Sequence, residues 1–121
     1  MILLNKPIVP LYILDTLRKL GARDETVGFH YTAYGVFLVL EQPQRLAFVT
    51  KWLYPAIGRK YQTTASAVER GIRLTIKYIL SEPRTPLFVR IFSDCKCLTS
   101  SRFISTVAEY LASEGLHKSS I

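Results

Sequence analysis

The sequence lacks several features that would place it in a familiar class of protein. Its only two cysteines, Cys95 and Cys97, are too few for the disulfide framework of a small secreted domain. Its longest apolar run, YGVFLVL at residues 34–40, is far shorter than the ~20 residues that span a bilayer. The opening MILLNKPIVPLY is interrupted by Lys6 and two prolines, unlike a signal peptide. We therefore expect a cytoplasmic protein with no membrane partner.

Groupings of catalytic or metal-binding side chains are also missing from the sequence. There is no Ser-His-Asp set, no Cys-His set, no phosphate-binding loop and no run of metal ligands. Cys95 and Cys97 supply two ligands, whereas a structural zinc site needs four, and His30 and His117 are distant in sequence. We expect two reduced, half-buried thiols and a packed or surface histidine at position 30. No metal, no cofactor, no catalytic residue and no enzymatic activity is predicted.

Acidic residues are scarce relative to basic ones. The chain of 121 residues has 9 Asp and Glu against 16 Lys and Arg, a formal net charge of +7. Such a surplus indicates a polyanionic partner, either nucleic acid or an anionic membrane surface. Six basic residues and one acidic residue lie between Val49 and Leu80, so most of the surplus is concentrated in about a quarter of the chain.

Apolar spacing predicts an all-α fold of five or six helices in one domain, residues 11–121, after an extended lead-in or linker remnant at residues 1–10. The predicted helices are at residues 11–20, 26–40, 44–54, 55–62 and 65–80, and at about 100–114. Gly21 and Gly115 are expected to end the first and the last, and Ser100 or Ser101 to begin the last. In the helix at 44–54, Trp52 is expected on the apolar face.

Residues 55–80 have the organisation of a helix-turn-helix. A short helix, a two-residue turn and a long helix follow one another, and Gly58 allows the two helices to approach closely. On the long helix one stripe is apolar and is expected to face the core: Val68, Ile72, Ile76 and Ile79. A separate polar stripe carries Ser66, Arg70, Arg73 and Lys77, with Glu69 at its edge. That stripe is either solvated surface or a face that enters the major groove.

The polar residues of this segment suit two kinds of DNA contact. Arg can donate two hydrogen bonds to guanine, and Glu can accept one from cytosine, whereas other basic residues suit phosphates. The candidate base contacts are Ser66, Glu69, Arg70 and Arg73. The candidate phosphate contacts are Lys51, Arg59, Lys60, Thr63, Thr64 and Lys77. The start of the helix is open: Thr64 is the N-cap, or Ser66 is, with Glu69 completing a capping box.

Residues 49–76, VTKWLYPAIGRKYQTTASAVERGIRLTI, resemble the helix-turn-helix of the stage-zero sporulation protein A family, response regulators that launch endospore formation. The shared blocks are Thr50-Lys51, Leu53-Tyr54-Pro55, Thr63-Thr64-Ala65-Ser66 and Val68-Glu69-Arg70, followed by Ile72 and Arg73. Residues 100–111, SSRFISTVAEYL, resemble the last helix of the family, and residues 21–31, GARDETVGFHY, align more weakly.

The resemblance implies a function as well as a fold. It implies an all-α effector domain, without catalytic activity, that binds short TGTCGAA-like boxes in double-stranded DNA as tandem dimers and is associated with the nucleoid. It implies that Glu69, Arg70 and Arg73 read bases. It also implies that residues 84–99 form a short helix and loop that contact RNA polymerase sigma factor, which replaces the strand that the β-like stretch LFVRIF, residues 87–92, would suggest.

The chain departs from the family pattern at several positions. Ala67 stands where the family has Arg, Gly71 where it has Ala and Lys77 where it has Glu, and residues 84–99 hardly match. These departures leave an alternative, a degenerate paralogue that acts as a protein-interaction module for another regulator or a polymerase subunit without specific DNA binding.

Overall fold

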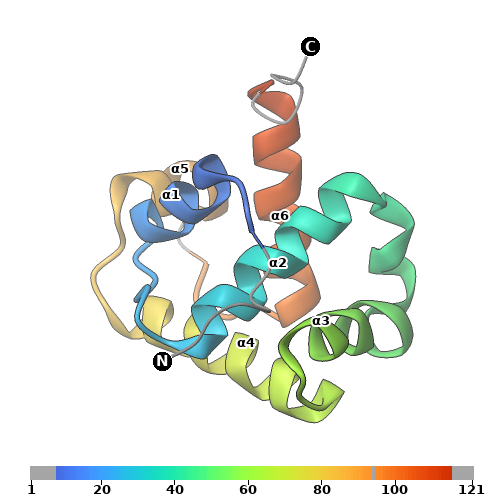
Figure 1. Ribbon diagram of the computed structural model, residues 1–121. Helices are drawn as coiled ribbons and strands as arrows, with labels where there is room; N and C mark the ends of the chain where they lie inside the picture. Colours follow the sequence, from blue (N-terminus) through green and yellow to red (C-terminus); the bar gives the residue numbers. More distant parts are fainter. Residues whose placement is uncertain (1–7, 94, 116–121) are drawn as a thin grey trace.

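A computed structural model of the chain describes residues 8–93 and 95–115, and it is all-α over those residues (Figure 1). The described α-helices are α1 (Leu11–Lys19), α2 (Val27–Glu41), α3 (Tyr54–Tyr61), α4 (Ala65–Ser81), α5 (Pro86–Phe92) and α6 (Ser100–Ser113). A 3₁₀ segment, η1 (Pro43–Phe48), and a π-helical segment, η2 (Val49–Leu53), connect α2 to α3. The all-α prediction is confirmed. Most of the predicted lead-in and the end of the predicted domain lie outside the described residues.

Helix α2 lies at the centre of the molecule and packs against α1, α3, α4 and α6 (Figure 1). Its glycines and apolar residues are buried over most of its length, so it serves as the axis of the core. The largest fully buried side chains come from every α-helix and include Ile13, Phe29, Ile57, Ile72, Phe88 and Phe103. None of the described helices combines the length and apolarity needed to cross a membrane.

The crossing of α2 and α4 depends on two glycines. A Cβ atom added to Gly28 would lie 2.2 Å from the carbonyl oxygen of Gly71, and one added to Gly71 would lie 2.8 Å from Cδ2 of Tyr31. Neither position has room for a side chain unless the helices move apart. Gly71 therefore allows α2 to cover the inner side of α4 closely, although glycine in the middle of a helix costs up to ~1 kcal/mol relative to alanine.

The prediction of one α-helix at residues 44–54 is wrong. Phe48 has φ −137° and ψ 66°, which separates a 3₁₀ segment from a π-helical segment. The N–H of Tyr54 donates to the carbonyl oxygen of Val49, and Pro55 has no N–H to continue an α-helical ladder. Leu53 is buried, but Trp52 is exposed together with Phe48, so Trp52 is not the core residue that the apolar spacing predicted.

Two predicted helix ends are confirmed and one predicted cap is wrong. Gly21 follows α1 with φ +105°, and Gly115 follows α6 with φ +76°. The cap of helix α6 lies one residue earlier than expected, because the hydroxyl oxygen of Thr99 accepts a hydrogen bond of 3.2 Å from the N–H of Arg102. Ser100 is buried inside the first turn and does not serve as the cap.

Candidate nucleic-acid interface

A tight turn joins α3 to α4. Gln62 adopts a left-handed conformation with φ +57°, and the N–H of Thr63 donates to the carbonyl oxygen of Gly58 at 2.8 Å. A Cβ atom on Gly58 would lie only 2.7 Å from the carbonyl oxygen of Thr63. The absence of a side chain at position 58 therefore lets the turn fold back on α3, which confirms the need for a small residue there.

Thr64 is the N-cap of α4. Its backbone is extended, with φ −90° and ψ 159°, and its hydroxyl oxygen accepts a hydrogen bond of 3.0 Å from the N–H of Ala67. Ser66 is already inside the helix, so the capping box formed by Ser66 and Glu69 is the wrong alternative. The carboxylate of Glu69 is consequently available for a partner on the surface of α4.

The two faces of α4 are separated as the sequence predicts. The buried face consists of Val68, Ile72, Thr75, Ile76 and Ile79, which includes every residue of the predicted apolar stripe. The four residues of the predicted polar stripe are all exposed: Ser66, Arg70, Arg73 and Lys77. Helix α4 forms the lower edge of the molecule in Figure 1, with α2 above it, so its polar face is directed away from the domain.

Glu69 and Arg73 form an ion pair on this face. Nε and Nη2 of Arg73 each donate a hydrogen bond of 3.1 Å to the carboxylate of Glu69. The Arg73 side chain is 59% exposed and that of Glu69 is 37% exposed, so the pair is at the surface and contributes little to stability. The hydrogen bonds to Glu69 raise the pKa of Arg73, which keeps the guanidinium charged. Two of its five N–H donors are used, and three remain for another partner.

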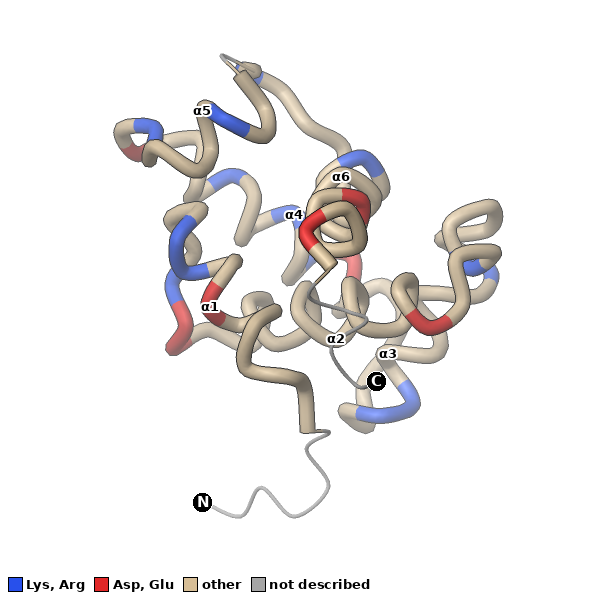
Figure 2. Tube along the Cα trace, turned by 90° about the horizontal axis from the view of Figure 1, so that it is seen from above, with Lys and Arg blue, Asp and Glu red and all other residues tan. Residues whose placement is uncertain are grey.

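The other basic residues of the segment have no hydrogen bond or ion pair to another residue in the described part of the chain. Arg70 and Lys77 are exposed on α4, Arg59 and Lys60 are exposed in the last turn of α3, and Lys51 is exposed on η2. Figure 2 shows the basic segment at the end of α3. These cations are consequently free to meet phosphate or base oxygens without first breaking a contact.

Two features of this region were missed in the sequence. The exposed rings of Phe48 and Trp52 lie beside each other on η1 and η2, with centroids 6.2 Å apart, next to Lys51. Leu74 is exposed on α4 between the polar stripe and the α2 crossing. The two prolines that bracket residues 43–55 are a sequence signal for irregular helix, but periodicity alone favoured a regular one.

No group of three His, Cys, Asp or Glu side chains that could hold a metal ion occurs within residues 8–93 and 95–115. The thiols predicted to be reduced and half-buried are both free, but only Cys95 is partly buried, and its Sγ donates to the carbonyl oxygen of Cys97 at 3.1 Å. His30 is partly buried with its ring 5.2 Å from that of Phe29.

Comparison with known protein families finds a match over most of the chain. A family model described as "Sporulation initiation factor Spo0A C terminal" matches residues 13–111. The matched range includes the complete α3-turn-α4 unit and most of α6.

Proposed function

The chain belongs to the Spo0A C-terminal family, the DNA-binding domains of sporulation initiation factors, and we propose that it recognises short TGTCGAA-like boxes by placing α4 in the major groove. The observation that supports this proposal is the exposed stripe of Ser66, Arg70, Arg73 and Lys77 on the side of α4 opposite its buried apolar face. A helix with one buried and one basic, exposed side suits the major groove, which is wide enough to admit it.

In this proposal Arg70 and Arg73 donate to guanine O6 and N7, and Ser66 contacts a base edge near the start of the helix. Glu69 has one of two roles: it accepts from cytosine N4, or it holds Arg73 in position. The second role is supported by the two hydrogen bonds that already join Glu69 to Arg73. With Nε and one hydrogen of Nη2 occupied, the remaining edge of the guanidinium carries the donors for a base.

Phosphate contacts come from the residues around α4. Lys51, Arg59, Lys60 and Lys77 supply exposed cations, and Thr63 and Thr64 flank the amino end of α4, where N–H groups and the helix dipole favour an anion. These contacts position the helix, whereas the base contacts specify the sequence.

The wider assembly belongs to the same proposal. Residues 11–121 act as one effector domain at the nucleoid, two copies bind neighbouring boxes in tandem, and residues 84–99, which include α5, contact RNA polymerase sigma factor.

Selection of bound duplexes from a random pool, with the purified chain, tests the proposal. The expected result is a consensus that resembles TGTCGAA and an affinity for it that falls steeply with salt, by a slope of about 0.9 per neutralised phosphate. A selected pool that stays random at every salt concentration would contradict it. That outcome would favour a protein-interaction module instead, for which the observation is Ala67, a partly buried residue of α4 that stands where the family has Arg.

A further inference from the structure

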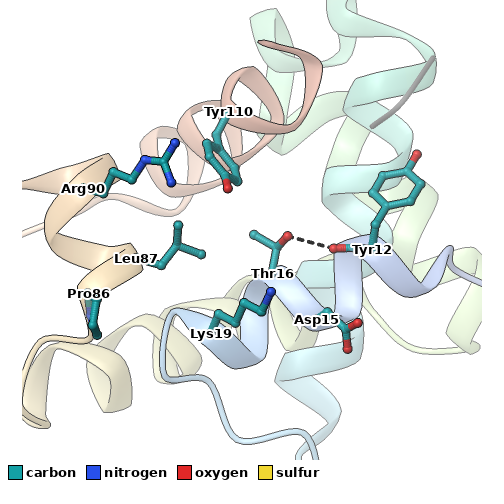
Figure 3. Close-up of a pocket in the computed structure, with 8 residues that line it drawn as sticks. All are labelled: Tyr12, Asp15, Thr16, Lys19, Pro86, Leu87, Arg90 and Tyr110. Carbon is teal, nitrogen blue, oxygen red and sulfur yellow. Dashed lines mark hydrogen bonds between the residues drawn. The ribbon is translucent and has the colours of Figure 1, made fainter. Parts of the chain in front are cut away.

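A cleft of about 500 Å³ lies between α1, α5 and α6, outside the candidate DNA interface (Figure 3). Its walls come from α1, near the start of the described residues, and from the consecutive helices α5 and α6. The lining residues are Tyr12, Asp15, Thr16, Lys19, Pro86, Leu87, Arg90 and Tyr110. The volume is within the ~300–1,000 Å³ that is usual for ligand sites.

The charges that line the cleft are not balanced. Lys19 of α1 and Arg90 of α5 lie on different walls in Figure 3, and Lys19 has no hydrogen bond or ion pair to another residue within residues 8–93 and 95–115. Arg90 has a long ion pair of 3.8 Å with Glu114, between two well-exposed side chains, which binds it weakly. Asp15, the one carboxylate among the eight lining residues, is already bonded to Arg18 at 2.9 Å. The cleft therefore presents two cations without a strong internal counterion.

The rest of the cleft is apolar and aromatic. Figure 3 shows the side chain of Leu87 between Arg90 and Lys19, and the ring of Tyr110 beside Arg90. The hydroxyl of Thr16 is not offered to a ligand, because it donates to the carbonyl oxygen of Tyr12 at 2.7 Å. A leucine flanked by two cations suits an apolar side chain that has a carboxylate next to it in sequence.

The apolar surface continues beyond the cleft. Leu11 is 64% exposed one helical turn from Asp15, and Val89 is 52% exposed one turn from Pro86, so each is a surface neighbour of a residue that lines the cleft. Exposed apolar residues beside an open, partly charged cleft are typical of a surface that binds a protein segment, not of a closed site for a small molecule.

The cleft and the DNA-reading helix lie on different sides of the domain. In Figure 1, α1 and α5 lie above α2, α6 crosses behind α2 and extends above it, and α4 lies below α2. In Figure 2, seen from above, α4 lies farther from the viewer than α6. A segment bound in the cleft would therefore leave the polar face of α4 accessible, and the two cations of the cleft are not among those expected on DNA.

We propose that the α1–α5–α6 cleft docks an acidic segment of a partner protein, whose carboxylate lies between Lys19 and Arg90 and whose neighbouring apolar side chain contacts Leu87. The charge of the cleft selects an acidic partner, and the exposed Leu11 and Val89 extend its contact with that partner. The cleft shares Pro86, Leu87 and Arg90 with the segment 84–99 that is proposed to contact sigma factor, so this inference rests on that part of the proposed function and gives it a chemistry. The docking does not require DNA and does not depend on the proposed reading of a DNA box.

Selection from a phage-displayed library of random 12-residue peptides, with the full chain as bait, tests the proposal. The expected peptides combine Asp or Glu with a neighbouring Leu, Ile or Phe. They should bind the double variant Lys19→Gln/Arg90→Gln at least ten-fold more weakly than the unchanged chain. Lys60→Gln, which removes one exposed cation at the end of α3, should leave their binding unchanged.

Three results would overturn it. They are the absence of any enriched peptide, peptides that bind the double variant as tightly as the unchanged chain, and peptides whose binding is weakened by Lys60→Gln. Self-association of the chain that is lost in the double variant would also overturn it, since the occupant would then be a second copy. Circular dichroism of the double variant checks that it is folded. Its affinity for duplex DNA should not change, so failure here is separate from failure of DNA recognition.

Discussion

Arg73 is held by Glu69 one helical turn earlier, through two hydrogen bonds of 3.1 Å that occupy one edge of its guanidinium. The pair is exposed, so its net contribution to folding is small, and its main effect is to orient the guanidinium of Arg73. A long, flexible side chain loses rotamer freedom when it binds a base, and a partner that restricts it beforehand reduces that cost.

Arg73→Ala should weaken binding to the selected box by ~1–3 kcal/mol and relax specificity at one position, because a bidentate base contact is lost. Lys60→Ala is the matched control. It should weaken binding to all duplexes alike and reduce the salt slope by about 1. Gel-shift titrations on the selected box and on a scrambled box give both quantities. If the Arg73→Ala variant still separates the two boxes as well as the unchanged chain does, Arg73 is excluded from base recognition.

Glu69→Gln tests whether Glu69 positions its partner. Loss of the carboxylate should raise affinity for scrambled DNA, since one negative charge is removed from the face of α4 that we propose meets DNA, and should lower the ratio of specific to non-specific binding. Stability should change by less than ~1 kcal/mol, as expected for an exposed pair. The double variant Glu69→Gln/Arg73→Ala should lose no more specificity than Arg73→Ala loses alone. Additive losses would mean that Glu69 reads a base independently.

Thr64→Ala should reduce the free energy of unfolding by ~0.5–2 kcal/mol, because the N–H of Ala67 loses its capping oxygen. Ser66→Ala is the control two residues later, and it should change stability by less than ~0.5 kcal/mol because Ser66 caps nothing. Urea denaturation of the two variants measures both values. A larger effect at Ser66 than at Thr64 would contradict the observed start of α4.

Gly28→Ala should destabilise the domain by at least ~1–3 kcal/mol, because its Cβ would lie 2.2 Å from a backbone oxygen of α4 that cannot move alone. Gly35→Ala, on the same helix, is the matched control. Its Cβ would meet the ends of the Ile57 and Ile104 side chains at 3.2 and 3.4 Å, and these can shift. Thermal denaturation should show a clearly lower melting temperature for Gly28→Ala. The melting temperature of Gly35→Ala should change little, since alanine also gains up to ~1 kcal/mol of helix propensity.

Stability should decline above about pH 10 through Tyr61. Burial, aided by Tyr34 and Tyr31, raises the pKa of Tyr61 to about 12 from the ordinary value of 10.0. The folded state therefore keeps this proton where the unfolded state releases it, so the contribution is complete below pH 10 and is lost between pH 10 and 12. Urea denaturation at about pH 9, 10 and 11 should give a shallower decline for Tyr61→Phe than for the unchanged chain. Parallel curves would show that another group causes the decline.

The local pattern predicted the described α-helices apart from α5, whose residues 87–92 are β-like by propensity. The spacing of Val68, Ile72, Ile76 and Ile79 predicted the buried side of α4, and all four are buried. Local chemistry was less decisive at helix starts, where Thr64 and Ser66, or Thr99 and Ser100, are equally suitable residues. The choice between them depends on which residue has the extended backbone of an N-cap, and the preceding turn sets that conformation.

By itself, the sequence determined most of the helices, the concentration of positive charge and the separation of polar from apolar residues on α4, because hydrogen bonds and side-chain spacing in a helix involve near neighbours. Only the tertiary structure decided what depends on distant segments. From the sequence, Gly71 only weakens its helix, whereas in the structure it makes room for the close contact with Gly28. Trp52 was expected on an apolar face, whereas it is exposed on the π-helical segment. The cleft between α1, α5 and α6 likewise exists only because packing of the core brings the two ends of the described chain together.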